Sequence, residues 1–567
     1  MKKNLLLLSI LLLVGTLSVR ANGITLQKVA LTDTNKTAKT AMIRFNIAWE
    51  NSWRDSINWD AAWIFVKFRE LKDSVWKYRH LTLSQTGNLP GTGNTTMKFA
   101  VSSDNKGVFY YRQLPGSGNV KMDSVKLLWN YALDKIANID SVEIKVFATE
   151  MVYVPAGNFS LGDGNGTQRS YNSFQLKNAP NNYAVITDKW SPLINTKNEG
   201  TLGAQYDDAI LYTDGIRISG LGGLDISGDK VAEYPDFPTG YRSFYCMKYD
   251  VTQGQYADFL NTLSLRDTTL SYYYTDTSRL KKVPVKYKLA LQTLDPVYGM
   301  TPLDLQRHTI VLDSTEVKYT VSRPDRAYAK GNTTTYLSFS DWAALRPMTE
   351  LEYEKAARGP LPPVYKTYNN NNYNNYNADT TSNWSGFDWA WGNDTSYART
   401  NSMPGNNTYN VLTYSGVENG TETFSNYNVY KRYINPVYSS NNMGNKTFSG
   451  GDGGDGPYRA GIFATDSSTR ISSGATYYGI MDFSKNVSKI VVSISYPASR
   501  TFSYKVHGDG MLNAYGNSDN AEFFSNGNNG PIMGGGSYLN KTGAVSERQN
   551  GYQFIGFRSV RTAPSDN

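Results

Sequence analysis

The sequence has few of the residues that build metal centres and disulfide bonds. Its 567 residues include one cysteine, Cys246, and three histidines, His80, His308 and His507. One thiol excludes an internal disulfide, and no closely spaced histidine pair exists that could hold zinc. The neighbours of Cys246 are aromatic and apolar, so we expect a buried core thiol. We expect His507 to be a hydrogen-bonded loop residue rather than a metal ligand.

Runs of like charge are also missing. Charged residues make up 19% of the chain, the formal net charge is +8, and no five consecutive residues carry charges of one sign. A nucleic-acid partner requires a clustered basic stripe. We therefore expect a mildly basic, solvated surface and no nucleic-acid partner.

Long apolar runs are absent beyond the N-terminus. The run Leu5–Val14 follows Lys2-Lys3 and precedes Val19-Arg20-Ala21, which is the plan of a secretory signal peptide over residues 1–22. The run is too short to span a bilayer, and no cysteine follows the cleavage site directly to carry a lipid. We expect an exported protein without a transmembrane segment, located in the periplasm, on the outer-membrane surface or outside the cell.

Residues 23–149 are rich in β-branched and aromatic residues, between turns made by Gly, Asn, Asp and Pro. Such short runs favour strands, and several of them in one segment predict a two-sheet β-sandwich. The predicted strands are Ile24–Val29, Thr40–Trp49, Ala62–Phe68, Thr95–Val101, Gly107–Tyr111, Val125–Trp129 and Val142–Ala148.

Tryptophan is concentrated in this segment. We expect Trp49, Trp53, Trp59, Trp63 and Trp76 to fill the core of the sandwich. A platform on which sugar rings stack is the alternative interpretation.

Two later stretches predict helices with defined starts. In Phe244–Leu263, Thr252 is a candidate N-cap, and the aromatic and aliphatic residues that follow recur at helical spacing on one face. In Tyr336–Gly359, the Thr349-x-x-Glu352 pattern is a capping box, and Gly359-Pro360 ends the helix. We expect the glutamates of the second helix and Arg358 to form structural ion pairs rather than acid–base machinery.

The C-terminal stretch combines a glycine run with a predicted final strand. Gly534–Gly536 lead into Ser537-Tyr538, and alternating residues from Phe554 to Val560 predict the strand. With Met151–Gly162 and Tyr478–Ile490, these stretches resemble the formylglycine-generating enzyme family, also called the sulfatase-modifying-factor domain. The matching motifs are Thr349-Glu350-x-Glu352-Tyr353-Glu354 with Ala356-Ala357-Arg358-Gly359, Gly535-Gly536-Ser537-Tyr538 and Gly556-Phe557-Arg558.

The resemblance implies an α+β protein. An N-terminal β-sandwich, residues 23–149, would precede a mixed domain of the formylglycine-generating-enzyme type over residues 150–567. That fold is related to C-type lectins and carries long loops. Residues 163–240 and 360–476 would be insertions.

The resemblance does not extend to the family's chemistry. The two cysteines that bind copper in that family correspond to Asn540 and Val545, and the histidine cluster of its iron-binding branch is absent. Neither side chain supplies a thiolate for a soft metal, so no catalytic residue is assigned and the chain is expected not to be an enzyme. The resemblance makes Asn486 a candidate calcium ligand, although Lys489 stands where the family has a carboxylate.

In relatives, the surface between the two closing motifs binds ligands. By position, the candidate binding residues here are Tyr538, Asn540, Ser546, Glu547, Arg548, Trp389 and Trp391. Tyrosine, tryptophan and arginine are effective contact residues on such a surface.

Three functions follow from these observations. The first is a secreted, non-catalytic binding or structural protein of the cell envelope, of a kind that resembles exported Bacteroidetes proteins, with an unidentified protein or glycan partner. The second is a formylglycine-generating or other oxidase with an unrecognised metal site. The third is a carbohydrate-binding protein, suggested by an aromatic content of 13%.

Overall fold

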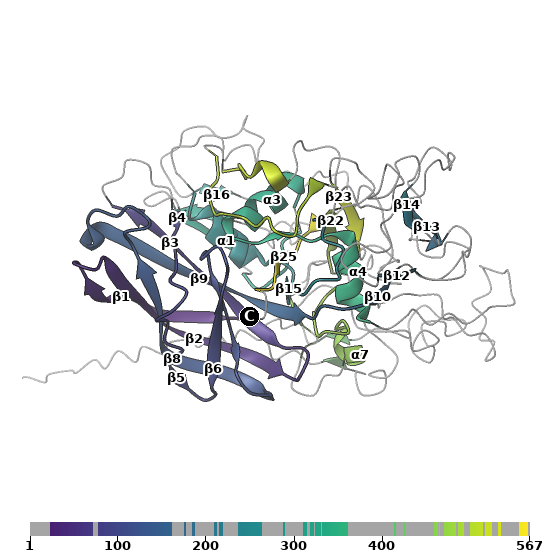
Figure 1. Cartoon of the computed structure of the whole chain (residues 1–567), viewed down its shortest axis with the longest axis horizontal. Helices are drawn as coiled ribbons and strands as arrows, with labels where there is room; N and C mark the ends of the chain where they lie inside the picture. The colour runs from purple at the N-terminus through teal and green to yellow at the C-terminus, as the bar shows by residue number, and fades with distance from the viewer. Residues whose placement is uncertain are drawn as a thin grey trace, which may run out of the picture.

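A computed structural model describes about half of the chain (Figure 1). Residues 1–22, which include the predicted signal peptide, lie outside it. The longer described segments are residues 23–71, 78–161, 236–263, 324–329, 331–360, 459–462, 470–483, 486–492, 501–513, 516–523 and 555–564, with single residues and short strands between them. This part of the chain is α+β, rich in strands and poor in helices.

The first sheet is antiparallel, with the order β1-β2-β8-β5. Its strands are β1 (Thr25–Asn35), β2 (Thr40–Arg54), β8 (Gly116–Asn130) and β5 (Thr92–Gly93). Along β2, buried and partly buried residues alternate, as expected of a strand with one face on a core. All seven predicted strand runs coincide with strands of this sheet or of the next one.

The second sheet has eight strands and continues into the C-terminal part of the chain. Its order is β19-β25-β15-β9-β3-β7-β6, and β4 pairs with β3. Its strands are β3 (Asp60–Glu70), β4 (Arg79–His80), β6 (Met97–Val101), β7 (Val108–Arg112), β9 (Val142–Val154), β15 (Phe244–Met247), β19 (Arg346–Pro347) and β25 (Ser559–Thr562). The predicted boundary between residues 149 and 150 falls inside β9, because the end of this strand pairs with β3 on one side and β15 on the other.

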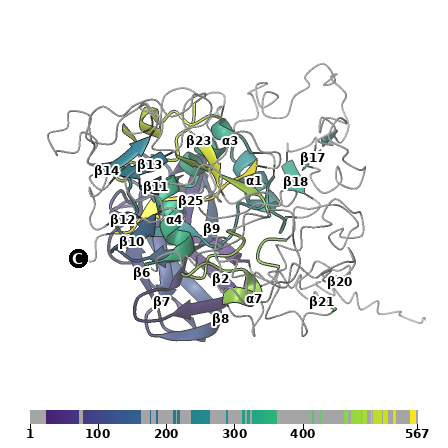
Figure 2. The ribbon, with the colours of Figure 1, turned by 90° about the vertical axis from the view of Figure 1, so that its right-hand side faces the viewer.

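Strand β3 is buried on both faces and makes the second sheet a middle layer. Ala62, Ile64 and Val66 face the first sheet, whereas Trp63 and Phe65 pack with helix residues on the other side. The layers are therefore sheet, sheet and helices (Figures 1 and 2). Burial on both faces explains why β3 is a nearly continuous apolar run.

The tryptophans are divided among different environments. Trp49 is in the core between the two sheets, as predicted, but Trp59 and Trp63 belong to the core between the second sheet and the helices. The prediction that all five fill the sandwich is wrong for these two, because β3 turns successive side chains to opposite faces. Trp76 lies outside the described residues, and Trp53 is only partly buried.

The predicted helices are confirmed. Helix α1 (Gln253–Leu260) starts at a capping box formed by Thr252 and Gln255, and its apolar face is buried. Helix α4 (Glu350–Arg358) starts at the predicted capping box of Thr349, ends at Gly359 and lies against β10 (Figure 2). Helix α3 (Thr333–Trp342) and the short α7 (Arg470–Ser473) complete the described helices.

The remaining described elements are short. Two are 3₁₀ turns, at Ile139–Ser141 and Ala521–Phe523. The others are β10 (Phe159–Leu161), β11 (Gln175–Leu176), β12 (Ala184–Ile186), β13 (Ala209–Tyr212), β14 (Gly215–Ile218), β16 (Tyr287–Leu289), β17 (Ile310–Asp313), β18 (Lys318–Val321), β20 (Thr413–Tyr414), β21 (Phe424–Ser425), β22 (Ser488–Val492), β23 (Pro531–Gly534) and β24 (Ile555–Gly556). In the part of the chain that the structure covers, no helix is both long and apolar enough to cross a membrane.

The predicted final strand is interrupted at its centre. Residues 557 and 558 separate β24 from β25, and the Arg558 side chain enters the core. Its Nε lies 2.8 Å from the Asp250 carboxylate, and its Nη1 donates to the Lys248 carbonyl at 2.9 Å. Another donor of the same guanidinium reaches the Met481 carbonyl. Arg558 thus ties the last strand to the end of β15 and to the loop before β22.

Substituting Arg558 with methionine should destabilise the protein strongly. The change removes the arginine partner of the buried Asp250 carboxylate and the guanidinium donors to buried carbonyls, so we expect the free energy of unfolding to fall by about 3–5 kcal/mol. Urea denaturation followed by tryptophan fluorescence measures it. In the control Lys505→Met, an exposed pair with Asp236 is lost, and the midpoint should hardly move. Equal effects of the two substitutions would contradict this role of Arg558.

Candidate functional site

The structure does not cover the predicted binding surface. Tyr538, Asn540, Ser546, Glu547, Arg548, Trp389 and Trp391 all lie outside the described residues. Their assignment stays a prediction.

The charged residues around helix α4 form buried ion pairs, as expected. The Arg346 guanidinium makes two hydrogen bonds to Glu352, at 2.8 Å and 2.6 Å. Arg358 pairs with Glu354 one helical turn earlier. Arg346, on β19, thus fixes the helix to the second sheet, and Arg358 also donates to the Ser160 carbonyl of β10 at 3.3 Å. Both roles are structural.

The thiol and His507 are also placed as predicted. Cys246 is buried in β15, and burial raises the pKa of its thiol to about 12, so it is protonated at neutral pH. His507 Nε2 accepts a hydrogen bond from the backbone N–H of Thr562 at 3.1 Å. His80 Nε2 lies 2.8 Å from the Trp342 carbonyl. Burial holds the pKa of both imidazoles well below the usual value.

The surroundings of Asn486 do not fit calcium. Asn486 is buried, but the nearby loop is organised around a cation that the chain supplies, the ammonium of Lys489. This ammonium donates to the Asp482 carbonyl at 2.5 Å and lies 3.6 Å from the Asp250 carboxylate. The Asp482 carboxylate in turn accepts from the N–H of Gly461 at 2.6 Å. Calcium needs several oxygen ligands. The oxygens here already contact Lys489 or a backbone N–H, so the described residues suit the lysine ammonium better than a calcium ion.

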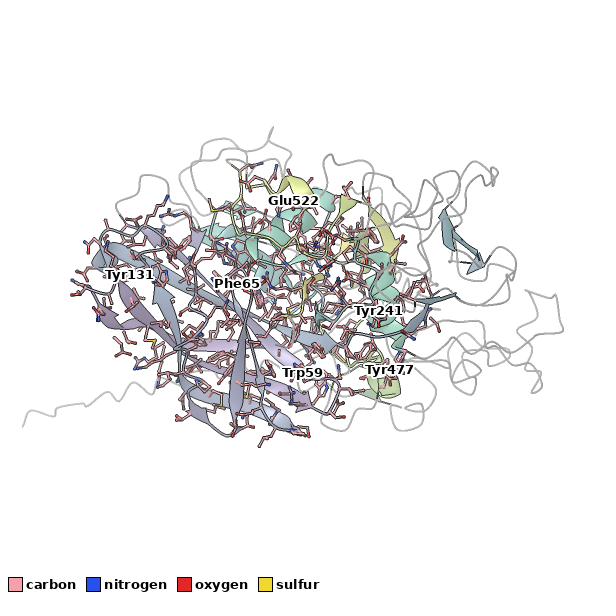
Figure 3. All side chains as sticks on the ribbon, in the orientation of Figure 1. Trp59, Phe65, Tyr131, Tyr241, Tyr477 and Glu522 are labelled. Carbon is pink, nitrogen blue, oxygen red and sulfur yellow. The ribbon has the colours of Figure 1, made fainter. Side chains whose placement is uncertain are left out.

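A cavity of about 300 Å³ lies beside the end of β2, where no site was predicted. Trp53 lines it from the end of β2, Asn58 from the turn between β2 and β3, and Lys248 and Tyr249 from the segment after β15. Arg470 of α7, residues 475–479 and Met481 also line it. Figure 3 shows Tyr477 on α7's side of the molecule, far from Tyr131 at the other end of the sandwich.

Four aromatic residues contribute to the walls of this cavity. Trp53, Tyr249, Tyr477 and Tyr478 all line it, and the rings of Tyr477 and Tyr478 meet edge to face with centroids 5.0 Å apart. Gly479 has a φ of +85°, and a Cβ there would lie 2.8 Å from the Trp53 ring. Glycine at this position therefore brings the loop close to Trp53 without filling the space.

Two charged residues, Lys248 and Arg470, line the cavity. The Lys248 ammonium is paired with the carboxylates of Glu150 at 2.8 Å and Asp60 at 3.5 Å. Arg470 donates to the Ala390 carbonyl at 2.8 Å, and its guanidinium lies 5.5 Å from the Tyr477 ring centroid. In the described part of the chain no carboxylate pairs with Arg470. Burial lowers the pKa of its guanidinium to about 10, which leaves it protonated at neutral pH.

Polar atoms in the cavity are left for a ligand. The Tyr249 side chain is 8% exposed, and its hydroxyl makes no hydrogen bond to any residue that the structure describes. The same holds for Nε of Arg470. Buried donors of this kind are normally satisfied, so a bound molecule with oxygen acceptors suits these positions.

Sequence reasoning missed this cavity because its residues are far apart in the chain. The clue in the sequence was the tryptophan-rich segment, for which sugar stacking was the alternative interpretation. Trp53 of that segment lines the cavity.

No known family model and no curated protein matches the chain.

An acidic cluster lies at the opposite end of helix α3 from its N-cap. The carboxylates of Asp341, Asp509 and Asp519 lie within 4.8 Å of one another. Asp341 is buried and accepts from the N–H groups of Asp509 and Gly510 and from the Ser518 hydroxyl. Burial, together with the neighbouring carboxylates, raises the pKa of Asp341 to about 7.

This raised pKa predicts a pH-dependent stability. The folded protein holds the Asp341 proton more tightly than the unfolded chain does. The resulting stabilisation is complete below about pH 4 and is lost as the pH rises through about 7. Asp341→Asn should flatten this slope, because the amide stays neutral and its oxygen still accepts the two N–H bonds. Urea denaturation of both proteins across this range measures it. Parallel pH profiles for the two proteins would count against the shifted pKa.

Proposed function

We propose that the protein is an exported, non-catalytic binding protein of the cell envelope. We also propose that its C-terminal part has the formylglycine-generating-enzyme type of fold, related to C-type lectins. The cavity between Trp53 and Tyr477 is the observation that carries the binding function. It combines aromatic walls with a few unsatisfied polar groups, which is the usual composition of a ligand site.

The chemistry of the described residues supports binding rather than catalysis. The glutamates and arginines of helix α4 are held in buried ion pairs, and the Cys246 thiol is buried and protonated. Oxidation by a copper-bound thiolate pair requires ionised, accessible sulfur. The positions that correspond to that pair are Asn540 and Val545.

A sugar is the ligand that suits this cavity best. A sugar ring presents C–H groups on its faces and hydroxyl groups around its edge. The faces would pack on the rings of Trp53 and Tyr477, and the hydroxyls would meet the Tyr249 hydroxyl and Nε of Arg470. The volume of about 300 Å³ suits a short terminal unit rather than an enclosed chain.

Glycan-array screening of the mature protein tests the proposal, with titration calorimetry on the glycans that bind. We expect binding, and we expect the glycan to be recovered unchanged in mass. Ala464→Trp, on the cavity wall, should weaken binding at least tenfold by filling the space. Leu133→Trp adds the same ring at an exposed position outside the cavity lining and should leave binding unchanged. Silence on the array, or binding that Ala464→Trp does not affect, would refute the proposal.

A further inference from the structure

We infer that the sugar bound in this cavity carries a carboxylate, as a uronic acid does, and that the carboxylate pairs with Arg470. This inference rests on the proposed binding function and adds the chemical class of the ligand. It follows from the balance of charge around the cavity.

The charge of Lys248, one of the two cations that line the cavity, is balanced by carboxylates of the protein. Lys248 faces two buried carboxylates, Glu150 and Asp60. The Asp60 carboxylate also accepts the Ser52 hydroxyl at 2.8 Å, and Arg112 donates to that hydroxyl at 3.0 Å. Lys248, the charged residue of this group that lines the cavity, is therefore already paired with carboxylates of the protein.

The charge of Arg470 has no such balance. Among the described residues that line the cavity there is no aspartate or glutamate, and in the same part of the chain Arg470 meets only a carbonyl and an aromatic ring. A largely buried guanidinium without a carboxylate is costly. A ligand carboxylate would offset that cost and would accept hydrogen bonds in the planar geometry that arginine provides.

The other residues that line the cavity favour a sugar ring that carries the carboxylate over a small inorganic anion. Arg470 lies over the Tyr477 ring, so a carboxylate held there places the attached ring among the aromatic walls. The Tyr249 hydroxyl is on the same cavity and can donate to a ring or hydroxyl oxygen. A small inorganic anion would satisfy the charge but leave the aromatic surface exposed to water.

The test compares trigalacturonate with its methyl ester, which keeps the rings and removes the charge. With the wild-type protein we expect calorimetry to show at least tenfold tighter binding of the acid, and we expect that preference to shrink as salt is added. Arg470→Gln should bind acid and ester equally, whereas Arg470→Lys should keep part of the preference.

The outcomes separate this inference from the proposed function. Equal binding of acid and ester by the wild-type protein would overturn the inference and leave glycan binding in place, and so would binding of neutral glycans alone. A preference for the acid that survives in Arg470→Gln would overturn the role of Arg470. The comparison of the two ligands needs only the wild-type protein, so it tests whether the ligand carries a carboxylate even if Arg470→Gln fails to fold, and Arg470→Lys then tests the role of Arg470.

Discussion

A buried ammonium joins the two halves of this protein. Lys248 follows β15, and its Nζ pairs with Glu150 on β9 and Asp60 on β3, all nearly inaccessible to water. The Asp60 carboxylate also accepts from the Trp53 N–H at 3.0 Å. Burial by itself would lower the pKa of Lys248, but the carboxylates of Glu150 and Asp60 raise it. The ammonium therefore stays charged. One buried set of charges therefore fixes β15 against the sandwich and places Trp53 at the cavity.

This connection accounts for the position of the cavity. The second sheet runs from the sandwich strands through β9 and β15 to the closing strand β25. The cavity lies where the end of β2 and the end of β15 meet the segment that contains α7. Neither the N-terminal strands nor the C-terminal segment has the complete set of walls, so the two parts are needed together to form the cavity.

The sequence predicts the local elements well because the relevant signals are local. Alternation marks the strands, and Thr252 and Thr349 mark two helix starts through capping boxes. It did not predict that β3 is buried on both faces or that β9 crosses the expected domain boundary, since both depend on which strands become neighbours. The cavity was not predicted for the same reason. Trp53, Lys248 and Arg470 lie in segments far apart in the sequence and come together only after folding. Lys489 shows the opposite case: its charge, visible in the sequence, already counted against calcium at Asn486, and its ammonium lies 3.6 Å from the Asp250 carboxylate.

The structure of the protein in complex with trigalacturonate would test the binding function most directly. We predict a sugar ring between Trp53 and Tyr477, with its carboxylate within hydrogen-bonding distance of the Arg470 guanidinium. A ligand bound at another surface, with the space between these rings left to water, would contradict the assignment of this cavity as the binding site.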